Sequence, residues 1–194
     1  MSKKIAIIGD GNVGGALTRG LTKARREVKN VGDDKAAILS AAEWADVVIL
    51  AVPFGALTDV AATIAPVTEA KTIIDVTNAL TPDMQLAVGF TTSGAEELQK
   101  KLPKARVVKA FNTQFAQQMD SGRLGDLAMT VFVAGDDATA KSDVVDVAKA
   151  IGFDPVDAGP LANARLLEPL GYLNIQLGYV LGQGTAIGLK LIRG

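Results

Sequence analysis

Three glycines near the start of the chain have the spacing of a phosphate-binding turn. The stretch Gly9-Asp10-Gly11-Asn12-Val13-Gly14 follows an apolar run and precedes a segment with helical spacing. Here Gly9 would make the tight turn, Gly11 would let the backbone approach a pyrophosphate, and Gly14 would let helix and strand pack closely. Backbone N–H groups at the helix start would hold the negative charge. We therefore expect a dinucleotide-binding turn, with an ordinary glycine turn as the alternative.

The absence of two residue types limits the remaining chemistry. The sequence has no histidine and no cysteine, which excludes serine–histidine and cysteine–histidine catalysis, disulfides and zinc-finger spacing. Carboxylate, lysine or tyrosine chemistry remains, as does chemistry carried by a bound cofactor. With 20 basic against 21 acidic residues the formal net charge is −1, so we expect no nucleic-acid surface. The expected partners are small molecules or a second copy of the chain.

Short apolar runs alternate with helix-forming segments along most of the chain. Runs such as VVILAV and TIIDV are rich in Val and Ile and do not alternate with polar residues, as in strands buried on both faces of a parallel sheet. The expected strands are residues 4–8, 27–31, 46–52, 72–76, 106–109, 129–134 and 155–158. The expected helices are residues 13–24, 35–44, 56–64, 95–101 and 138–151. This order predicts an α/β fold of the Rossmann type with a doubly wound, mostly parallel sheet.

Residues that follow the strands are the next candidates, because an open parallel sheet binds ligands at the carboxyl ends of its strands. Together with the glycine turn, the candidate cofactor-binding residues are Gly9, Asp10, Gly11, Asn12, Val13, Gly14, Asp33, Asp34, Lys35, Ala51, Val52, Pro53, Phe54, Thr77, Asn78, Phe111 and Asn112. The polar ones among them could equally be ordinary turn formers. The long segment 78–92 could form a lip over the site.

Other polar residues have structural explanations. Ser93-Gly94-Ala95-Glu96 fits a capping box at the start of a helix. Asp136 and Asp137 precede the expected helix 138–151, where a carboxylate accepts backbone N–H bonds, so we predict caps and no metal site. We expect Trp44 to serve packing.

Five stretches carry a resemblance to a known family. GDGNVGGAL, ADVVILAVPF, VVKAFNT, VAGDD and DAGPLANARLLEPLGYLNIQL resemble the NADP oxidoreductase, coenzyme F420-dependent family, whose relatives include the reductase domain of the STEAP metalloreductases. The GPLANARLLEPL block is the most specific of them. The resemblance implies a dinucleotide-binding domain over residues 1–158 and a C-terminal helical extension over 159–194 that closes the site, the two forming one compact unit.

The same resemblance implies direct hydride exchange between a nicotinamide (NADP or NAD) and a deazaflavin, coenzyme F420, or a flavin. Hydride transfer between two rings needs positioning more than a protein acid or base, which fits the absence of histidine. In the C-terminal block, Asn163 and Arg165 are candidates to hold the acceptor. Arg165 could instead pair with Glu168, one helical turn away.

The chain departs from the family where the cofactor ribose would lie. Members typically have a small hydroxyl residue at the position of Asp10, and a Gly-Ser-Arg stretch after the second strand that receives the NADP 2′-phosphate. This chain has Asp10 and Val31-Gly32-Asp33-Asp34. Carboxylates repel a phosphate, whereas an acid about twenty residues past the turn binds a free ribose 2′-OH. The residues of this chain favour NAD, whereas the family resemblance favours NADP. Lys35 could still contact a 2′-phosphate, and Arg25, Arg26 and Lys29 are near it in the sequence.

Two other functions remain open. One is a small-substrate dehydrogenase or imine reductase, in which Lys109 or Tyr172 would donate the proton. Lys109 could instead extend its charge to solvent, and Tyr172 with Tyr179 could belong to the core. The other is a nucleotide-binding redox sensor without catalysis.

No segment suggests export or a membrane. The apolar run before Gly9 has four residues, and the region 170–181 is short and interrupted by Asn174 and Gln176. We therefore expect a cytoplasmic protein. The final LGYVLGQGTAIGLKLI is apolar enough to be buried in the fold or in a homodimer interface.

Overall fold

A computed structural model describes residues 3–194. Within that range, seven strands form one sheet in the order β2-β1-β3-β4-β5-β8-β9. The strands are β1 (Ile5–Ile8), β2 (Val28–Val31), β3 (Val47–Leu50), β4 (Thr72–Asp75), β5 (Arg106–Lys109), β8 (Thr130–Gly135) and β9 (Asp154–Asp157). Neighbouring strands run parallel except β5 and β8, which are antiparallel. The predicted mostly parallel sheet is confirmed.

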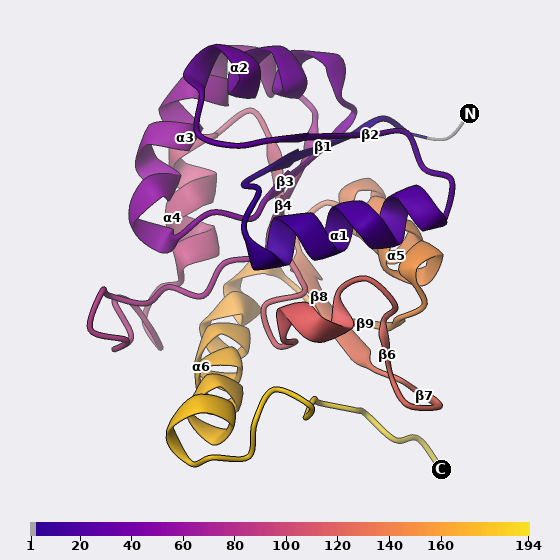
Figure 1. The fold of residues 1–194 in the computed structure, drawn as a ribbon. Helices are drawn as coiled ribbons and strands as arrows, with labels where there is room; N and C mark the ends of the chain where they lie inside the picture. Colours follow the sequence, from indigo (N-terminus) through magenta and orange to yellow (C-terminus); the bar gives the residue numbers. More distant parts are fainter. Residues whose placement is uncertain (1–2) are drawn as a thin grey trace.

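Helices cover both faces of this sheet (Figure 1). They are α1 (Asn12–Lys23), α2 (Lys35–Trp44), α3 (Leu57–Ile64), α4 (Gly94–Lys101), α5 (Ala138–Ile151) and α6 (Ala164–Ile175). Helices α1 and α5 pack on one face, and α2, α3 and α4 pack on the other. Helix α6 continues into a π-helical turn, Gln176–Val180, and lies beyond the sheet edge with the C-terminal chain. A small hairpin, β6 (Arg123–Leu124) with β7 (Leu127–Ala128), stands apart from the sheet.

The apolar runs are buried on both faces, as the sequence predicts. In β1, Ile5 and Ile7 pack into the core beneath α1 and α5, while Ala6 and Ile8 pack into the core beneath α2, α3 and α4. Side chains of a strand alternate between faces, so a strand inside two helical layers must be apolar throughout. The doubly wound fold is therefore confirmed. Its order places the change in winding direction between β1 and β3.

The predicted cap of α5 is confirmed for Asp137, which accepts a hydrogen bond from Ala140 N. Asp34, predicted as a cofactor-binding residue, instead caps α2 and accepts from Ala37 N. Asp136, predicted as a cap, instead accepts from Leu161 N and so ties the sheet to the segment before α6. These short side chains satisfy N–H groups that helix starts leave free.

Trp44 serves packing, as predicted. Its ring packs against the core beneath α2 and α3, and the Lys29 ammonium lies 4.3 Å from the ring centroid.

From residue 181 on, the C-terminal chain has no regular structure and is held by the side chains of Gln118 and Thr130. Gln118 Nε2 donates to Thr185 O, and Leu191 N donates to Thr130 Oγ1. Ile192 nevertheless remains 84% exposed. The tail is therefore partly anchored on the fold and partly open. Among residues 3–194, no helix has both the length and the apolar character needed to cross a membrane.

Candidate dinucleotide-binding site

The geometry of the glycine turn explains each of its three glycines. Gly9 has φ +109°, and a Cβ there would collide with Ala51 O. A Cβ at Gly14 would collide with Gly9 O, because the helix starts directly against the turn. At Gly11 a Cβ would meet no atom within 4 Å, so this backbone position faces open space. The turn thus needs Gly9 and Gly14 for its shape and leaves Gly11 accessible to a ligand.

The start of α1 is prepared for an anion. Gly11 is its N-cap residue, no side chain caps it, and its first turn carries no acidic residue. The first N–H groups of a helix have no partner within the helix and carry partial positive charge. With an open Gly11 beside them, these groups have the geometry that diphosphate-binding helix starts use.

Asn30, on β2, holds the turn in place. Its side-chain amide donates to Ile7 O and to Gly9 O, at 3.1 and 2.9 Å. Asn30 was not among the predicted site residues. The signal was an amide in the second expected strand, between Val28 and Val31.

A cavity of about 430 Å³ opens on one side of the turn. Its walls include the apolar side chains of Ile38, Val52 and Val60, which suit a flat base. The predicted residues that line it are Gly9, Asp10, Gly11, Asp33, Lys35, Ala51, Val52 and Pro53. They come from the ends of β1, β2 and β3, where the winding direction changes.

Three carboxylates and one ammonium line this first cavity; Asp59 comes from α3, and the other charged groups lie at the end of β2. A Cβ added to Gly32 would lie 2.9 Å from Asp10 Oδ2, so the Asp10 side chain reaches from the glycine turn across to the β2–α2 connection. Asp33 and Lys35 line the same cavity. Asp34 does not, because its carboxylate caps α2.

A second cavity, of about 220 Å³, lies on the other side of the start of α1. The predicted residues Asn12, Val13, Asn78 and Asn112 line it. The sequence analysis missed its remaining lining residues, Gln114, Phe115, Ala116, Gln117, Gly171, Asn174, Ile175 and Tyr179. The uncapped helix start thus stands between two cavities, as a diphosphate stands between the two nucleosides of a dinucleotide.

Helix α6 reaches the second cavity through a glycine. Asn78 Nδ2 donates to Asn112 O, and Asn112 Nδ2 donates to Asn78 Oδ1 and to Leu167 O. A Cβ at Gly171 would lie 2.5 Å from Asn78 Oδ1 and 2.7 Å from Asn112 Nδ2. Only glycine therefore lets α6 approach the two asparagines this closely.

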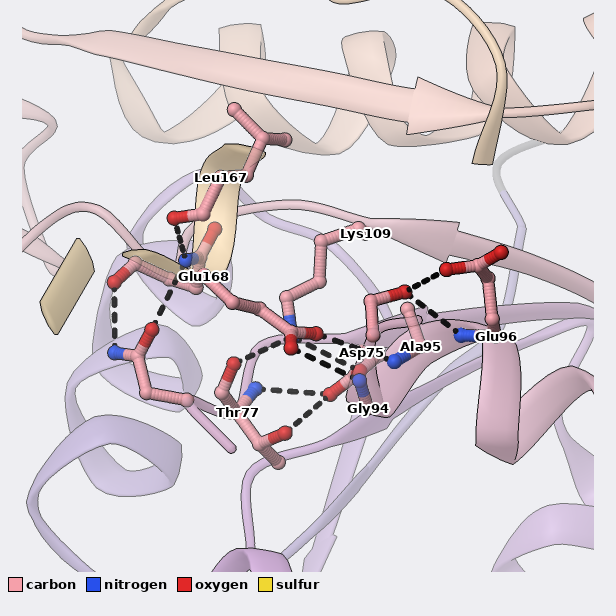
Figure 2. Close-up of polar contacts among 11 residues, drawn as sticks. Asp75, Thr77, Gly94, Ala95, Glu96, Lys109, Leu167 and Glu168 are labelled. Carbon is pink, nitrogen blue, oxygen red and sulfur yellow. Dashed lines mark hydrogen bonds and ion pairs between the residues drawn. The ribbon is translucent and has the colours of Figure 1, made fainter. Parts of the chain in front are cut away.

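Figure 2 shows a buried charge cluster formed by Asp75, Lys109 and Glu168. Lys109, the last residue of β5, is fully buried, and its Nζ lies 3.0 Å from Asp75 Oδ2 and 3.0 Å from Glu168 Oε1. It also donates to Thr77 O at 2.5 Å. Burial by itself would lower the pKa of Lys109, but the carboxylates of Asp75 and Glu168 outweigh it and raise the pKa. The alternative in which Lys109 extends its charge to solvent is therefore wrong.

The two carboxylates of the cluster have further donors. Asp75 Oδ1 accepts from the backbone N–H and the hydroxyl of Thr77. Glu168 accepts from Gly94 N and Ala95 N at the start of α4. Asp75 and Glu168 were not among the predicted site residues, although a lysine and an aspartate inside buried strands signal that partners must exist.

The other predicted cofactor-binding residues lie outside both cavities. Thr77 is buried against Asp75, and Phe54 packs on the core beneath α3. Phe111 is fully buried and meets Phe153 edge-on, with ring centroids 5.6 Å apart. Its φ of +66° is strained for a bulky residue and turns the chain sharply after β5, so that Asn112 enters the second cavity.

Asn163 and Arg165 also lie outside both cavities and have protein partners. Asn163 Nδ2 donates to Ala158 O across the turn before α6. Arg165 donates from Nε and Nη2 to the two Glu96 carboxylate oxygens, at 2.9 and 2.6 Å. The alternative pairing of Arg165 with Glu168 is wrong, since Glu168 belongs to the Lys109 cluster. The predicted contact of Asn163 and Arg165 with an acceptor stays a prediction.

The predicted capping box is half formed, because the Glu96 side chain pairs with Arg165. Glu96 N donates to Ser93 Oγ at 3.2 Å, as predicted. The Glu96 carboxylate, however, binds Arg165 from α6. A charge-assisted bidentate pair is stronger than a single bond to a backbone N–H.

Within residues 3–194, no group of three or more acidic side chains could hold a metal ion.

Comparison with known proteins agrees with this geometry. Residues 4–79 match a model of the NADP oxidoreductase, coenzyme F420-dependent family. Over 100 residues the chain is 37% identical to metalloreductase STEAP3 of Rattus norvegicus, a match that covers 52% of this chain and 20% of STEAP3. A solved structure from Arthrobacter sp. FB24, described as a candidate F420-dependent NADP reductase, is 28% identical with a TM-score of 0.90, and the match covers 99% of this chain and 100% of that one.

A more distant solved structure shares the fold alone. A reductive aminase from Aspergillus terreus is 17% identical, with a TM-score of 0.64, over 94% of this chain and 63% of that one.

The fold is of the Rossmann type, and these matches make the chain similar to NAD(P)-dependent oxidoreductases. The resemblance to the F420-dependent NADP oxidoreductase family is confirmed. The chain spans about a fifth of the length of the curated relatives it matches.

Proposed function

We propose that this protein transfers a hydride between a nicotinamide dinucleotide and a planar ring acceptor, a deazaflavin such as coenzyme F420 or a flavin. The carrying observation is the pair of cavities on either side of the uncapped start of α1. The first would hold the adenosine half, the N–H groups of α1 the diphosphate, and the second the nicotinamide half. The cofactor supplies the hydride chemistry.

The second cavity suits this reaction because its wall can position rings without transferring protons. Among the described residues, its lining consists of amide, aromatic and aliphatic side chains and Gly171, with no ionisable group except the Tyr179 hydroxyl. Asn78 and Asn112 are held by hydrogen bonds to each other and to α6, so the wall is rigid. A rigid apolar and amide wall orients two stacked rings and excludes water.

Turnover tests the proposal. The protein is mixed with NADPH or NADH and, separately, with oxidised F420, FMN and FAD, and loss of reduced nicotinamide is followed by absorbance. We expect turnover with at least one acceptor. Tight dinucleotide binding without turnover with any acceptor would support the non-catalytic alternative, and no dinucleotide binding at all would overturn the proposal.

We further propose that NAD(H) binds at least as well as NADP(H). Asp10 and Asp33 both line the first cavity at the end of β2, where a ribose 2′-phosphate would meet them. Lys35 lines the same cavity and is the one cation there to oppose them among the described residues.

The structure offers little support for a small-substrate reductase that uses Lys109 as its proton donor. Lys109 is fully buried, paired with two carboxylates, and has a raised pKa. A proton donor needs contact with substrate and a pKa near the working pH. Tyr172 is accessible, and its hydroxyl lies 3.4 Å from Gln85 Oε1 in the 78–92 segment.

A further inference from the structure

We propose that the buried cluster Asp75–Lys109–Glu168 carries a net negative charge that favours the oxidised, cationic form of the nicotinamide in the second cavity. This inference rests on the proposed function, since it assigns the nicotinamide half to that cavity. The three residues would act through the cavity wall, as positioning and electrostatic groups, and would not touch the reacting atoms.

The charge of the cluster follows from its contacts. One ammonium faces two carboxylates, each at 3.0 Å from Lys109 Nζ, and all three side chains are fully buried. Each carboxylate accepts two further N–H or O–H bonds, so its oxygens act only as acceptors. The sum is one unit of negative charge, which the partial positive charge at the start of α4 offsets in part.

The cluster is joined to the second cavity by short connections (Figure 2). Lys109 Nζ binds the carbonyl of Thr77, and the next residue, Asn78, lines the cavity. Leu167, the neighbour of Glu168 in α6, accepts a hydrogen bond through its carbonyl from Asn112, which also lines the cavity. The cluster therefore lies directly behind the wall that the two asparagines form.

The other charges around the cluster do not cancel it. Among the described residues, no side chain that lines the second cavity carries a formal charge at neutral pH. Glu96, in the first turn of α4, is neutralised by its bidentate pair with Arg165. In a protein interior of low dielectric constant, one unit of charge acts over several ångströms with little screening.

The nicotinamide changes its charge in the reaction. When reduced nicotinamide passes a hydride, one proton with two electrons, to the flavin or deazaflavin ring, its own ring becomes cationic. A fixed negative charge nearby stabilises this product relative to the neutral reduced ring. The acceptor ring that receives the hydride becomes the anionic reduced ring, so the two rings together keep their total charge. The cluster thus favours loss of hydride by the nicotinamide, and it should raise the affinity of the oxidised dinucleotide relative to the reduced one.

The test measures the ratio of Kd values for oxidised and reduced dinucleotide, by titration of the full chain with NAD+, NADH, NADP+ and NADPH. In Glu168→Gln the cluster becomes neutral while the amide oxygen can still accept from α4. We expect the oxidised-to-reduced Kd ratio to rise roughly fivefold or more. Damage to the fold would weaken both forms together and leave the ratio unchanged.

Asp143→Asn is the matched control. Asp143 accepts from Thr72, at the opposite end of β4 from Asp75, so this variant removes one carboxylate charge far from the second cavity. We expect its ratio to equal that of the wild type. Should Glu168→Gln not fold, Asp75→Asn removes the same charge and leaves the Lys109–Glu168 pair in place.

The outcomes are distinct. An unchanged ratio in a folded Glu168→Gln or Asp75→Asn variant that binds both forms overturns this inference and leaves the proposed function intact. An equal rise of the Kd ratio in Asp143→Asn also overturns this inference, because the effect would then come from the total charge of the protein. Absence of dinucleotide binding in the wild type would overturn the proposed function itself.

Discussion

Gly11 is the one residue of the glycine turn whose missing side chain faces open space. We predict that Gly11→Ala lowers dinucleotide affinity at least tenfold, about 1.4 kcal/mol, because the methyl group would stand where the backbone meets the diphosphate. The fold should be retained. Gly55→Ala is the matched control, since a Cβ there also meets nothing within 4 Å. Unchanged affinity in folded Gly11→Ala would show that the diphosphate lies elsewhere.

Asp10 and Asp33 carry the second prediction at this scale. Asp33→Arg combined with Asp10→Thr should shift preference towards NADP(H) by something on the order of 1–3 kcal/mol, because a charge-assisted contact replaces repulsion. Competition titrations at low salt measure the shift, since screening is then smallest. Asp34→Asn is the control, because Asp34 caps α2 and asparagine can cap it too. If the wild type binds NADPH clearly more tightly than NADH, our interpretation of these aspartates is wrong.

Helices α4 and α6 are joined by the ion pair between Glu96 and Arg165. The bidentate bond from Arg165 holds the pKa of the Glu96 carboxyl below its usual value of 4.5. A depressed carboxyl pKa stabilises the fold above the unfolded-state pKa, and that contribution is lost as the pH falls through the folded-state pKa. Urea unfolding should therefore show wild type more stable than Glu96→Gln at pH 7, with the difference shrinking steadily below about pH 4.5. A constant difference across this range would contradict the prediction.

Arg165→Ala tests the same pair from the other side and also the acceptor prediction for this residue. If Arg165 serves only to join α6 to α4, Arg165→Ala and Glu96→Gln should lose similar stability and keep the same acceptor KM. If Arg165 holds the acceptor, only Arg165→Ala should raise that KM. Steady-state kinetics of both variants, at saturating dinucleotide, distinguish the two cases.

At the scale of the whole molecule, the Lys109 cluster joins β4, β5, α4 and α6 in the interior. Lys109→Met would leave two buried carboxylates without their cation, and we expect a loss of roughly 3–5 kcal/mol in the free energy of unfolding. Lys141→Met is the comparison. It breaks a pair whose Asp157 side chain is 65% exposed, which should cost at most about 1 kcal/mol. Equal losses in the two variants would mean that the cluster adds no special stability.

Local sequence patterns were enough to predict the fold and to locate the glycine turn. Uniformly apolar strands indicate burial on both faces, and the glycine spacing locates the turn, because both signals are local and each follows from a backbone requirement at that position. The same holds for Asp137, whose capping depends only on a residue three positions away. Strand ends were predicted to within a residue or two for the same reason.

Tertiary contacts determine which residues line the second cavity and which side chains form the charge cluster. Gly171, Asn174 and Tyr179 line the cavity only because α6 returns to the ends of β4 and β5, and no local pattern states where a helix beyond the sheet will dock. Glu168 meets Lys109 across 59 positions of chain, and Arg165 meets Glu96 across 69. Which carboxylate receives which cation depends on the docking of α6. That docking depends on many weak contacts across the folded molecule. These contacts cannot be found by inspecting a single sequence residue by residue.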